Sequence, residues 1–481
     1  MNADELGTGQ RWVSEPTLAE RFLGDPRVRQ ARSQLLSVLA EYQAGLTSVR
    51  QADPALRADY EQLLDQFSEL RGGALYYPYL GSGLGNVALV ELADGSVKYD
   101  LIGGIGVHGL GHSHPELVAA SLDAALRDLV MQGNLQQNVE SVQVSRLLVE
   151  MACQQGAKLV HCFLSTSGAM ANENALKMVF QKHYPADRLL AFEGCFMGRT
   201  LALAQVTDRA AYREGLPQTL AVDYVPFFKA QSPQASTEQA LATLRRHLGR
   251  YPGQHAAMCF ELVQGEGGYY PGDRPFFVAL MRELKRRGVA VVVDEVQTFG
   301  RTSQPFAFQH FGLDEYVDVV TVGKLTQLCA TLFTEEYRPR PGLISQTFTA
   351  ATASIFAARA ILTRLRRGDF FGPQGRVAQI HQRFVERLEG IGQRHPGWVQ
   401  GPYGIGAMIG FQVFDGSAEL TRRVLRELFD AGVIAFQAGA NPARVRFLPP
   451  VGAIRDKDID AACDILEQTL ARVVAAASPG A

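Results

Sequence analysis

Two side chains that could act on one ligand follow two apolar runs of the sequence. Asp294 follows the run 288–293, and Lys324 ends the run 317–324. Each run has the length and the β-branched content of a strand that is buried on both faces, as in a parallel sheet. Because open α/β sheets bind ligands at the carboxyl ends of their strands, we expect this carboxylate and this amine to face one ligand site.

This pairing of acid and amine suits pyridoxal phosphate. A lysine can hold the cofactor as a Schiff base, and a buried aspartate can pair with its pyridine nitrogen. An aspartate after an apolar strand also occurs in P-loop ATPases, but the motif Gly-x-x-x-x-Gly-Lys-[Ser/Thr] is absent from this sequence. Gly104, Gly106 and Gly109 match the spacing of the dinucleotide-binding motif Gly-x-Gly-x-x-Gly. That motif should directly open a helix, but residues 111–115 lie between these glycines and the next predicted helix.

Small polar residues at one strand-to-helix junction form a candidate phosphate site. Ser167, Gly168 and Ala169 open a predicted helix, where free backbone N–H groups and the helix dipole favour an anion. An ordinary capped helix is the alternative. At a second junction, Phe196 could stack on a planar ring, and Arg199 could bind a carboxylate with two hydrogen bonds. Without a ligand, such an aromatic residue belongs to the core and such an arginine to the solvated surface.

Two further charged residues are candidates for binding a substrate. Glu266 lies in a glycine-rich loop after the predicted strand 257–263, which indicates a site loop. Arg446 lies in an apolar strand and therefore needs an acidic partner or an anionic ligand. Glu266 could pair with a substrate-binding arginine in one state and release it in another. A solvated acid and a structural ion pair are the alternatives.

The order of predicted elements indicates an α/β protein with several domains. The length of 481 residues favours two or three domains. Residues 1–72 predict a polar helical extension that packs on its own chain or on a partner subunit, and 73–117 predict the first segment of a small domain. Strands alternate with helices over 118–345, which predicts a large domain with a mostly parallel sheet. Residues 346–481 predict a smaller α+β domain that opens with a helical region over 351–396.

The composition argues against several classes of protein and of binding site. The net charge of −2 gives no basic excess for a nucleic-acid partner. The six cysteines contain no Cys-x-x-Cys pair, which favours reduced thiols over disulfides or a zinc site. His112 and His114 have no third ligand nearby, so we expect no metal. Neither a signal peptide nor a membrane-spanning stretch is evident, and we expect a cytoplasmic protein without a membrane partner.

Taken in order, six segments resemble the class III (omega-amino-acid) aminotransferases, which are pyridoxal-phosphate enzymes of fold type I. The resemblance runs from about Tyr76 to Leu470. It implies a large domain with a mostly parallel sheet, a smaller α+β C-terminal domain, and a homodimer. The matching segments are 104–115, 166–173, 196–200, 264–268, 294–301 and 323–324.

The resemblance also implies roles for the residues around the cofactor. Lys324 would form the Schiff base, and Asp294 would keep the pyridine nitrogen protonated. Gln297 would contact the ring hydroxyl, while Val296 and Phe196 would cover the two faces of the ring. The phosphate would be bound by Ser167, Gly168 and Ala169, joined by Thr347 of the second subunit.

For the substrates, the resemblance implies an arginine clamp. Arg446 would bind the α-carboxylate of 2-oxoglutarate or glutamate. In ornithine-type members, Glu266 pairs with that arginine while an ω-amine is the donor, and Arg199 receives the distal carboxylate. The expected reaction is a ping-pong transfer to 2-oxoglutarate of an amino group from lysine, ornithine, N-acetylornithine or 4-aminobutyrate. Lys324 would move the proton, for which its amine must be neutral.

The sequence departs from the family pattern at several positions. Met197 replaces a usual His or Trp, Leu262 replaces a usual Pro, and Tyr403 replaces a usual Arg. Residues 349–351 are Thr-Ala-Ala where Gly-Gly-Asn is usual, next to the expected phosphate contact of Thr347. The stretch 323–329 looks like the lysine 6-aminotransferase branch, which favours a basic amino acid as the donor.

Two other functions remain open on the sequence. A decarboxylase, an aminomutase or a racemase of the same fold type could use the same lysine and aspartate. A non-catalytic paralogue could use the N-terminal extension to bind a partner.

Overall fold

The computed structural model describes residues 15–128, 130–131 and 133–477. Their contacts divide the described chain into two compact units. The first unit contains residues 15–127, 379–402 and 409–477, and the second contains residues 128–378 and 403–408 apart from the gaps at 129 and 132. The domain limits expected after residues 72, 117 and 345 stay a prediction.

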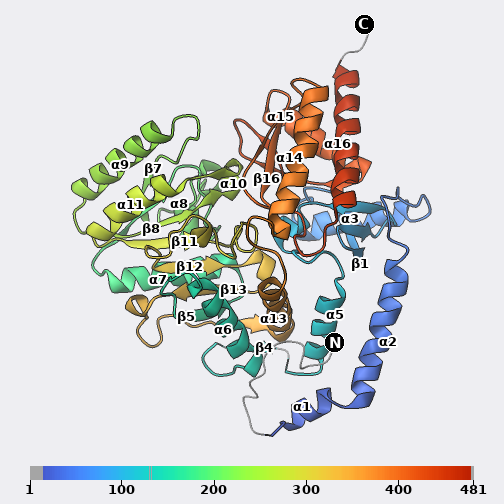
Figure 1. Ribbon diagram of the computed structural model, residues 1–481, viewed down its shortest axis with the longest axis horizontal. Helices are drawn as coiled ribbons and strands as arrows, with labels where there is room; N and C mark the ends of the chain where they lie inside the picture. The colour runs from blue at the N-terminus through green and yellow to red at the C-terminus, as the bar shows by residue number, and fades with distance from the viewer. Residues whose placement is uncertain (1–14, 129, 132, 478–481) are drawn as a thin grey trace. The chain divides into compact units, whose positions relative to one another are not determined.

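A seven-stranded sheet forms the centre of the second unit, in the order β5-β13-β12-β11-β8-β6-β7. All neighbouring strands are parallel except β13, which is antiparallel to both β12 and β5. Helices α9 and α11 lie on one side of the sheet and α7 on the other (Figure 1). The strands are β5 His161–Ser165, β6 Arg188–Phe192, β7 Ala221–Val225, β8 His255–Glu261, β11 Ala290–Asp294, β12 Val319–Val322 and β13 Cys329–Phe333.

Helices around this sheet follow apolar periodicity and local caps. In α11, Phe276, Phe277 and Leu284 are buried on one face, and the Asp273 side chain accepts the Phe276 N–H at 2.8 Å. The helices of this unit are α6 Val139–Cys153, α7 Gly168–Lys182, α8 Leu203–Val206, α9 Pro233–Arg250, α10 Gly265–Gly268, α11 Arg274–Arg286, α12 Ala307–His310 and α13 Thr352–Arg367. Its shorter elements are β4 Val130–Met131, β9 Val263–Gln264, β10 Tyr270–Pro271, β14 Ala350–Ala351 and the 3₁₀ turns η2 Ala210–Tyr212, η3 Lys324–Thr326 and η4 Glu335–Tyr337.

Two four-stranded sheets form the first unit, in the orders β1-β2-β3-β17 and β15-β16-β19-β18. Strand β17 pairs in parallel with β3, which joins the N-terminal and C-terminal segments of this unit. The strands are β1 Gly81–Asn86, β2 Leu89–Leu92, β3 Val97–Asp100, β15 Val399–Tyr403, β16 Ile409–Val413, β17 Val433–Ile434, β18 Phe436–Ala438 and β19 Arg444–Phe447. The helices are α1 Leu18–Leu23, α2 Pro26–Gln43, α3 Arg57–Arg71, α4 Gly103–Gly106, α5 Pro115–Ala125, α14 Arg376–Arg394, α15 Ala418–Ala431 and α16 Asp456–Ala477.

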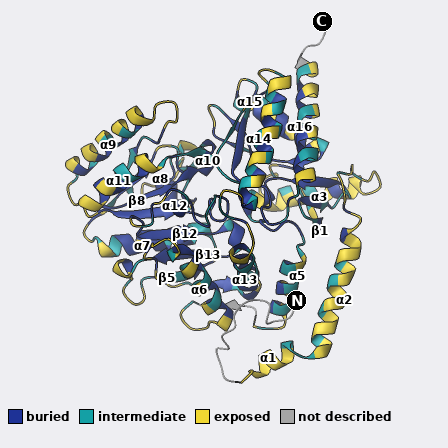
Figure 2. Cartoon of the chain, viewed as in Figure 1, coloured by how far each residue is buried: buried dark blue, intermediate teal, exposed yellow. Residues whose placement is uncertain are grey.

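Helices α1, α2 and α3 of the N-terminal segment pack on their own unit, partly through polar contacts. Arg32 forms an ion pair with Asp123 at 2.6 Å, and the Gln43 amide donates to the Gly85 carbonyl at 2.7 Å. Much of α1 and α2 is exposed (Figure 2), including Tyr42 with 70% of its surface accessible.

The secondary structure differs from the expectation in two places. The helical region expected over 351–396 is interrupted between α13 and α14, because Gly372 has a φ of 89° and a Cβ at Gly375 would lie 2.4 Å from the Phe371 carbonyl oxygen. The strand β13 was not expected, although it is a short apolar run. No helix among the described residues is long and apolar enough to cross a membrane. The cytoplasmic location stays a prediction.

Candidate cofactor site

Asp294 and Lys324 lie at the ends of neighbouring strands, as the sequence predicted. Asp294 is the last residue of β11, and it is paired in register with Thr321 of β12. Lys324 follows β12 and begins the turn η3. Asp294 is buried and Lys324 is half-buried. The sheet therefore brings one acid and one amine to the same edge.

Hydrogen bonds hold the Asp294 carboxylate in place. Its Oδ1 accepts the Val296 backbone N–H at 2.8 Å, and its Oδ2 accepts the Asn172 side-chain amide at 2.7 Å. Burial raises the pKa of Asp294 above its usual value, while the two hydrogen bonds and the Lys324 charge oppose this increase. A cationic group in contact with this carboxylate would lower the pKa again, so the site is suited to a protonated ring nitrogen.

The backbone of Lys324 is strained. Its φ is 51°, and three residues later Gln327 has a φ of 54°. The Gln327 N–H donates to the Lys324 carbonyl at 2.8 Å, and the Lys324 N–H donates to the Cys329 thiol, which closes a tight turn. A Cβ at Gly323 would lie 2.7 Å from the Cys329 sulfur, so the chain has room only for glycine before the lysine. Left-handed non-glycine residues cost about 1–2 kcal/mol each and are concentrated at functional sites.

The predicted phosphate site lies at the start of α7. Ser167 is the N-cap, and its hydroxyl accepts the Met170 N–H at 3.2 Å. A Cβ at Gly168 would lie 2.9 Å from Val296 Cγ1, so the helix start and the residue after the Asp294 strand are in close contact. A Cβ at Gly198 would lie 3.4 Å from the Ala169 side chain, which places the 196–200 loop beside the same helix start.

The 196–200 loop presents an aromatic ring and an exposed arginine. Phe196 is half-buried, and its ring meets the Tyr212 ring edge to face at 6.3 Å. The Arg199 guanidinium lies 4.1 Å from the centre of the same Tyr212 ring. Arg199 is thus held near Phe196 by a cation–π contact, in a position open to solvent.

Gln297 and Glu266 come from neighbouring loops of the same unit. Gln297 is buried, and a Cβ at Gly265 would lie 2.6 Å from its side-chain amide. Glu266 follows Gly265 and is half-buried, and its backbone carbonyl accepts the Arg209 guanidinium at 2.8 Å. These contacts place the loop of Glu266 directly beside the segment after Asp294.

Thr347 and Arg446 were also predicted to bind the cofactor or the substrate. No contact described above involves them, and their roles stay predictions. Thr347 is exposed in the segment before β14, beside an exposed Phe348. Arg446 belongs to the other unit, where it is buried in β19 with its guanidinium 5.3 Å from the centre of the Phe436 ring.

Sequence reasoning gave no role to Glu261, which is buried beside Asp294. The two residues are paired in register across β8 and β11. Glu261 accepts the backbone N–H of Phe196 and that of Gly265, each at 2.9 Å. Burial, together with the Asp294 charge, raises the pKa of Glu261 to about 8. This carboxyl group therefore holds together the loop of the stacking ring and the loop of Glu266.

Asn172 was also missed as a site residue, although the matching segment contained it. It lies four residues after Gly168 in α7, so the two residues share one helix face. Helical spacing from the predicted phosphate site could have identified it.

The residues of this unit fit the three reactive parts of pyridoxal phosphate. The start of α7 offers backbone N–H groups to a phosphate, Asp294 offers a buried carboxylate to the pyridine nitrogen, and Lys324 offers an amine to the aldehyde. The absence of a Cβ at Gly168 keeps the space beside Val296 open.

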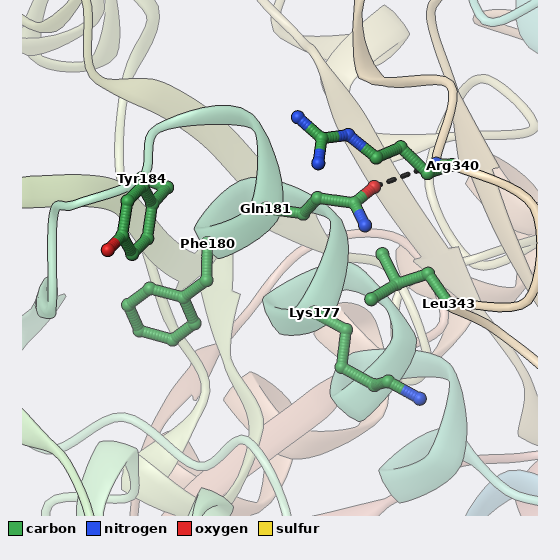
Figure 3. Close-up of a pocket in the computed structure, with 6 residues that line it drawn as sticks. All are labelled: Lys177, Phe180, Gln181, Tyr184, Arg340 and Leu343. Carbon is green, nitrogen blue, oxygen red and sulfur yellow. Dashed lines mark hydrogen bonds between the residues drawn. The ribbon is translucent and has the colours of Figure 1, made fainter.

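A separate depression of about 600 Å³ lies at the opposite end of α7 (Figure 3). It contains none of the predicted site residues. The Arg340 backbone N–H donates to the Gln181 side chain at 2.7 Å across it. The depression is lined by Lys177, Phe180, Gln181, Tyr184, Arg340 and Leu343.

This chain is similar to known proteins along most of its length. Residues 83–470 match the family model "Aminotransferase class-III". Acetylornithine aminotransferase of Myxococcus xanthus is 30% identical over 86% of this chain and 100% of its own length. Acetylornithine aminotransferase of Pseudomonas putida is 28% identical over 88% of this chain and 98% of its own length.

Solved structures show the same fold. Lysine aminotransferase from M. tuberculosis superposes with a TM-score of 0.76 at 23% identity, over 85% of this chain and 99% of its own. Ornithine aminotransferase from Toxoplasma gondii superposes with a TM-score of 0.74 at 20% identity, over 91% of this chain and 98% of its own. The expected fold type I architecture, with a large and mostly parallel sheet, is confirmed.

Proposed function

Because the chain belongs to the class III aminotransferases, we propose that it moves the ω-amino group of a basic amino acid to 2-oxoglutarate. The family membership confirms the predicted enzyme class and the predicted cofactor, pyridoxal phosphate. The observation that carries the proposal is the placement of Asp294 and Lys324 at the ends of β11 and β12, with the start of α7 beside Val296.

We infer the amino donor from the names of the relatives and from the sequence of the turn 323–329, which contains Lys324. The relatives and several of the structural neighbours are named for acetylornithine, lysine and ornithine, which are all basic amino acids or their derivatives. The turn 323–329 has Leu-Thr-Gln-Leu after Lys324 where Ala-Leu-Gly-Gly is usual, and it looks like the lysine 6-aminotransferase branch. We therefore rank lysine, ornithine and N-acetylornithine above 4-aminobutyrate.

When bound, pyridoxal phosphate supplies the electron sink that makes the substrate C–H bond acidic. Asp294 keeps the ring nitrogen protonated, because a buried carboxylate binds a neighbouring cation strongly. Lys324 would hold the cofactor through Nζ, and the same nitrogen would carry the proton once the lysine is released. This step needs Lys324 as the neutral amine.

The two half-reactions would use one site in alternation, as a ping-pong sequence requires. We propose that Arg446 binds the α-carboxylate of 2-oxoglutarate, and that Glu266 neutralises this arginine while the ω-amine donor is bound. Arg199 would bind the distal carboxylate, because its guanidinium is exposed yet held on Tyr212. The active form would be a homodimer in which Thr347 reaches the phosphate of the neighbouring site.

A donor panel tests the proposal. The enzyme would be incubated with 2-oxoglutarate and one donor (lysine, ornithine, N-acetylornithine, 4-aminobutyrate or a diamine), and the glutamate formed would be measured. We expect glutamate with at least one basic amino acid and none with the variant Lys324→Ala. Release of CO₂, racemisation or an intramolecular amino shift, without glutamate, would replace transamination by another reaction of the same fold type.

A further inference from the structure

Asn172 makes direct contact with three parts of the cofactor site while itself remaining buried. Its side-chain nitrogen lies 2.7 Å from Asp294 Oδ2 and 2.8 Å from the Met197 carbonyl oxygen, and its side-chain oxygen lies 2.8 Å from the Thr321 hydroxyl. We propose that Asn172 is a positioning residue that fixes the Asp294 carboxylate and keeps it ionised for the cofactor.

The chemistry of its neighbours determines which way the Asn172 amide points. The Met197 carbonyl can only accept a hydrogen bond, and so can an ionised Asp294 carboxylate. The amide atom that faces both must therefore be the nitrogen, which has two N–H groups to donate. The oxygen then faces Thr321 and accepts its hydroxyl proton, so Thr321 locks the amide in this orientation.

A neutral donor suits this position better than a cation would. An arginine or lysine against Asp294 would neutralise the carboxylate before the cofactor's ring nitrogen could pair with it. Asn172 stabilises the negative charge through one short hydrogen bond and leaves the charge itself available. Burial acts in the opposite direction and favours the protonated form of Asp294, so the contribution of the amide is needed.

Asn172 also connects the separate contacts that the cofactor needs. Gly168 and Asn172 are one turn of α7 apart, about 6 Å along the helix axis. The Thr331 hydroxyl donates to the Ala171 carbonyl at 2.8 Å and anchors this turn to β13. The bond to Met197 ties in the loop of Phe196. One rigid helical turn thus sets the spacing between the phosphate contact, the aspartate and the stacking ring.

The chain offers a matched control on the same helix. Asn174 is equally buried, and its amide donates to the Ser165 hydroxyl at 3.2 Å rather than to Asp294. Asn174→Ala removes a buried amide from α7 and should destabilise the protein without changing Asp294. Asn172→Ala, Asn172→Asp and Thr321→Val test the proposal, and Thr321→Val is close to isosteric, so it remains informative if the other variants fold poorly.

The first readout is the affinity of the apoenzyme for pyridoxal phosphate, which requires no amino donor. A lost hydrogen bond to a charged group predicts a dissociation constant about ten- to a hundredfold higher in Asn172→Ala. Asn172→Asp should bind at least as poorly, because it places a second anion beside Asp294. Thr321→Val should fall between wild type and Asn172→Ala, and Asn174→Ala should bind as wild type does.

The second readout is the stability of the full-length apoenzyme as a function of pH. The pKa of Asp294 is raised in the fold, so its contribution to stability is largest at acid pH and is lost as the pH rises through the folded pKa. Asn172→Ala should raise that pKa further and extend the loss to higher pH, whereas Asn174→Ala should lower stability equally at all pH values.

The proposal fails if Asn172→Ala binds pyridoxal phosphate with wild-type affinity and keeps the wild-type pH dependence. It also fails if Asn174→Ala lowers affinity as much as Asn172→Ala does, since the effect would then be one of helix packing. Neither result depends on the identity of the donor, so a failure of the proposed function would be recognised separately by the donor panel.

Discussion

Replacing Glu261 by glutamine should remove a pH-dependent part of the protein's stability. The pKa of Glu261 is raised to about 8 by burial and by the Asp294 charge. The folded protein therefore retains a proton that the unfolded chain releases near its ordinary value of 4.5. The resulting stability is complete at pH values below the unfolded pKa and is lost as the pH rises toward the folded one.

The structure gives the size and the sign of the effect. Each unit of pKa shift corresponds to about 1.4 kcal/mol, so this group alone could remove up to about 4–5 kcal/mol of unfolding free energy between acid and mildly alkaline pH. Glutamine keeps one carbonyl oxygen, so only one of the two backbone donors, Phe196 and Gly265, keeps its acceptor. The unpaired donor costs about 1–3 kcal/mol. Glu261→Gln should thus be less stable than wild type at acid pH. Because the pH-dependent loss in wild type exceeds this cost, the two curves should converge and then cross as the pH rises.

Urea unfolding of the apoenzyme across a pH series measures both effects. Glu61→Gln on the exposed face of α3 is the control. Its unfolding free energy, plotted against pH, should run parallel to that of wild type. If Glu261→Gln keeps the wild-type slope against pH, Glu261 does not titrate in the folded protein, and the reasoning is refuted. The same holds if the variant is more stable than wild type at acid pH.

Three other changes have defined outcomes. Gly168→Ala should weaken binding of pyridoxal phosphate by about 1–3 kcal/mol, because the new Cβ would lie 2.9 Å from Val296 Cγ1; a fluorescence titration measures it, and unchanged affinity would contradict the tight contact. Gln327→Gly should raise stability to urea by up to about 1 kcal/mol, because glycine relieves a φ of 54°; a loss of stability would mean that the glutamine side chain stabilises the turn. Arg446→Lys should raise KM for 2-oxoglutarate about tenfold or more, because lysine cannot form the bidentate hydrogen bonds that arginine makes to a carboxylate. An unchanged KM in steady-state assays would show that Arg446 does not bind the acceptor.

The elements that carry the cofactor could be predicted because their signals are local. The strand that ends at Asp294 and the strand that precedes Lys324 are continuous apolar runs, and the start of α7 is marked by small polar residues after such a run. The two strands are hydrogen-bonded neighbours in the sheet, so the predicted convergence of acid and amine followed from the rule that parallel strands share one carboxyl edge.

What the sequence did not reveal depends on contacts between distant segments. Glu261 gains its role from lying beside Asp294 across two strands, and Asn172 from reaching a strand end more than a hundred positions away. The strand β13 is antiparallel in a sheet that is otherwise parallel, and its short run has no periodicity to separate it from a loop. Glu266 was singled out over Glu261 because a glycine-rich loop is visible in the sequence, whereas the burial of a carboxylate is not.

Chemical trapping of the cofactor on its lysine tests the central claim most directly. The holoenzyme would be reduced with borohydride, digested, and mapped by mass spectrometry for a lysine that carries the reduced phosphopyridoxyl group. We predict the modification at Lys324 in the wild type, and its loss together with glutamate formation in Lys324→Ala. Modification of a different lysine, or glutamate formation by Lys324→Ala at the wild-type rate, would contradict the assignment.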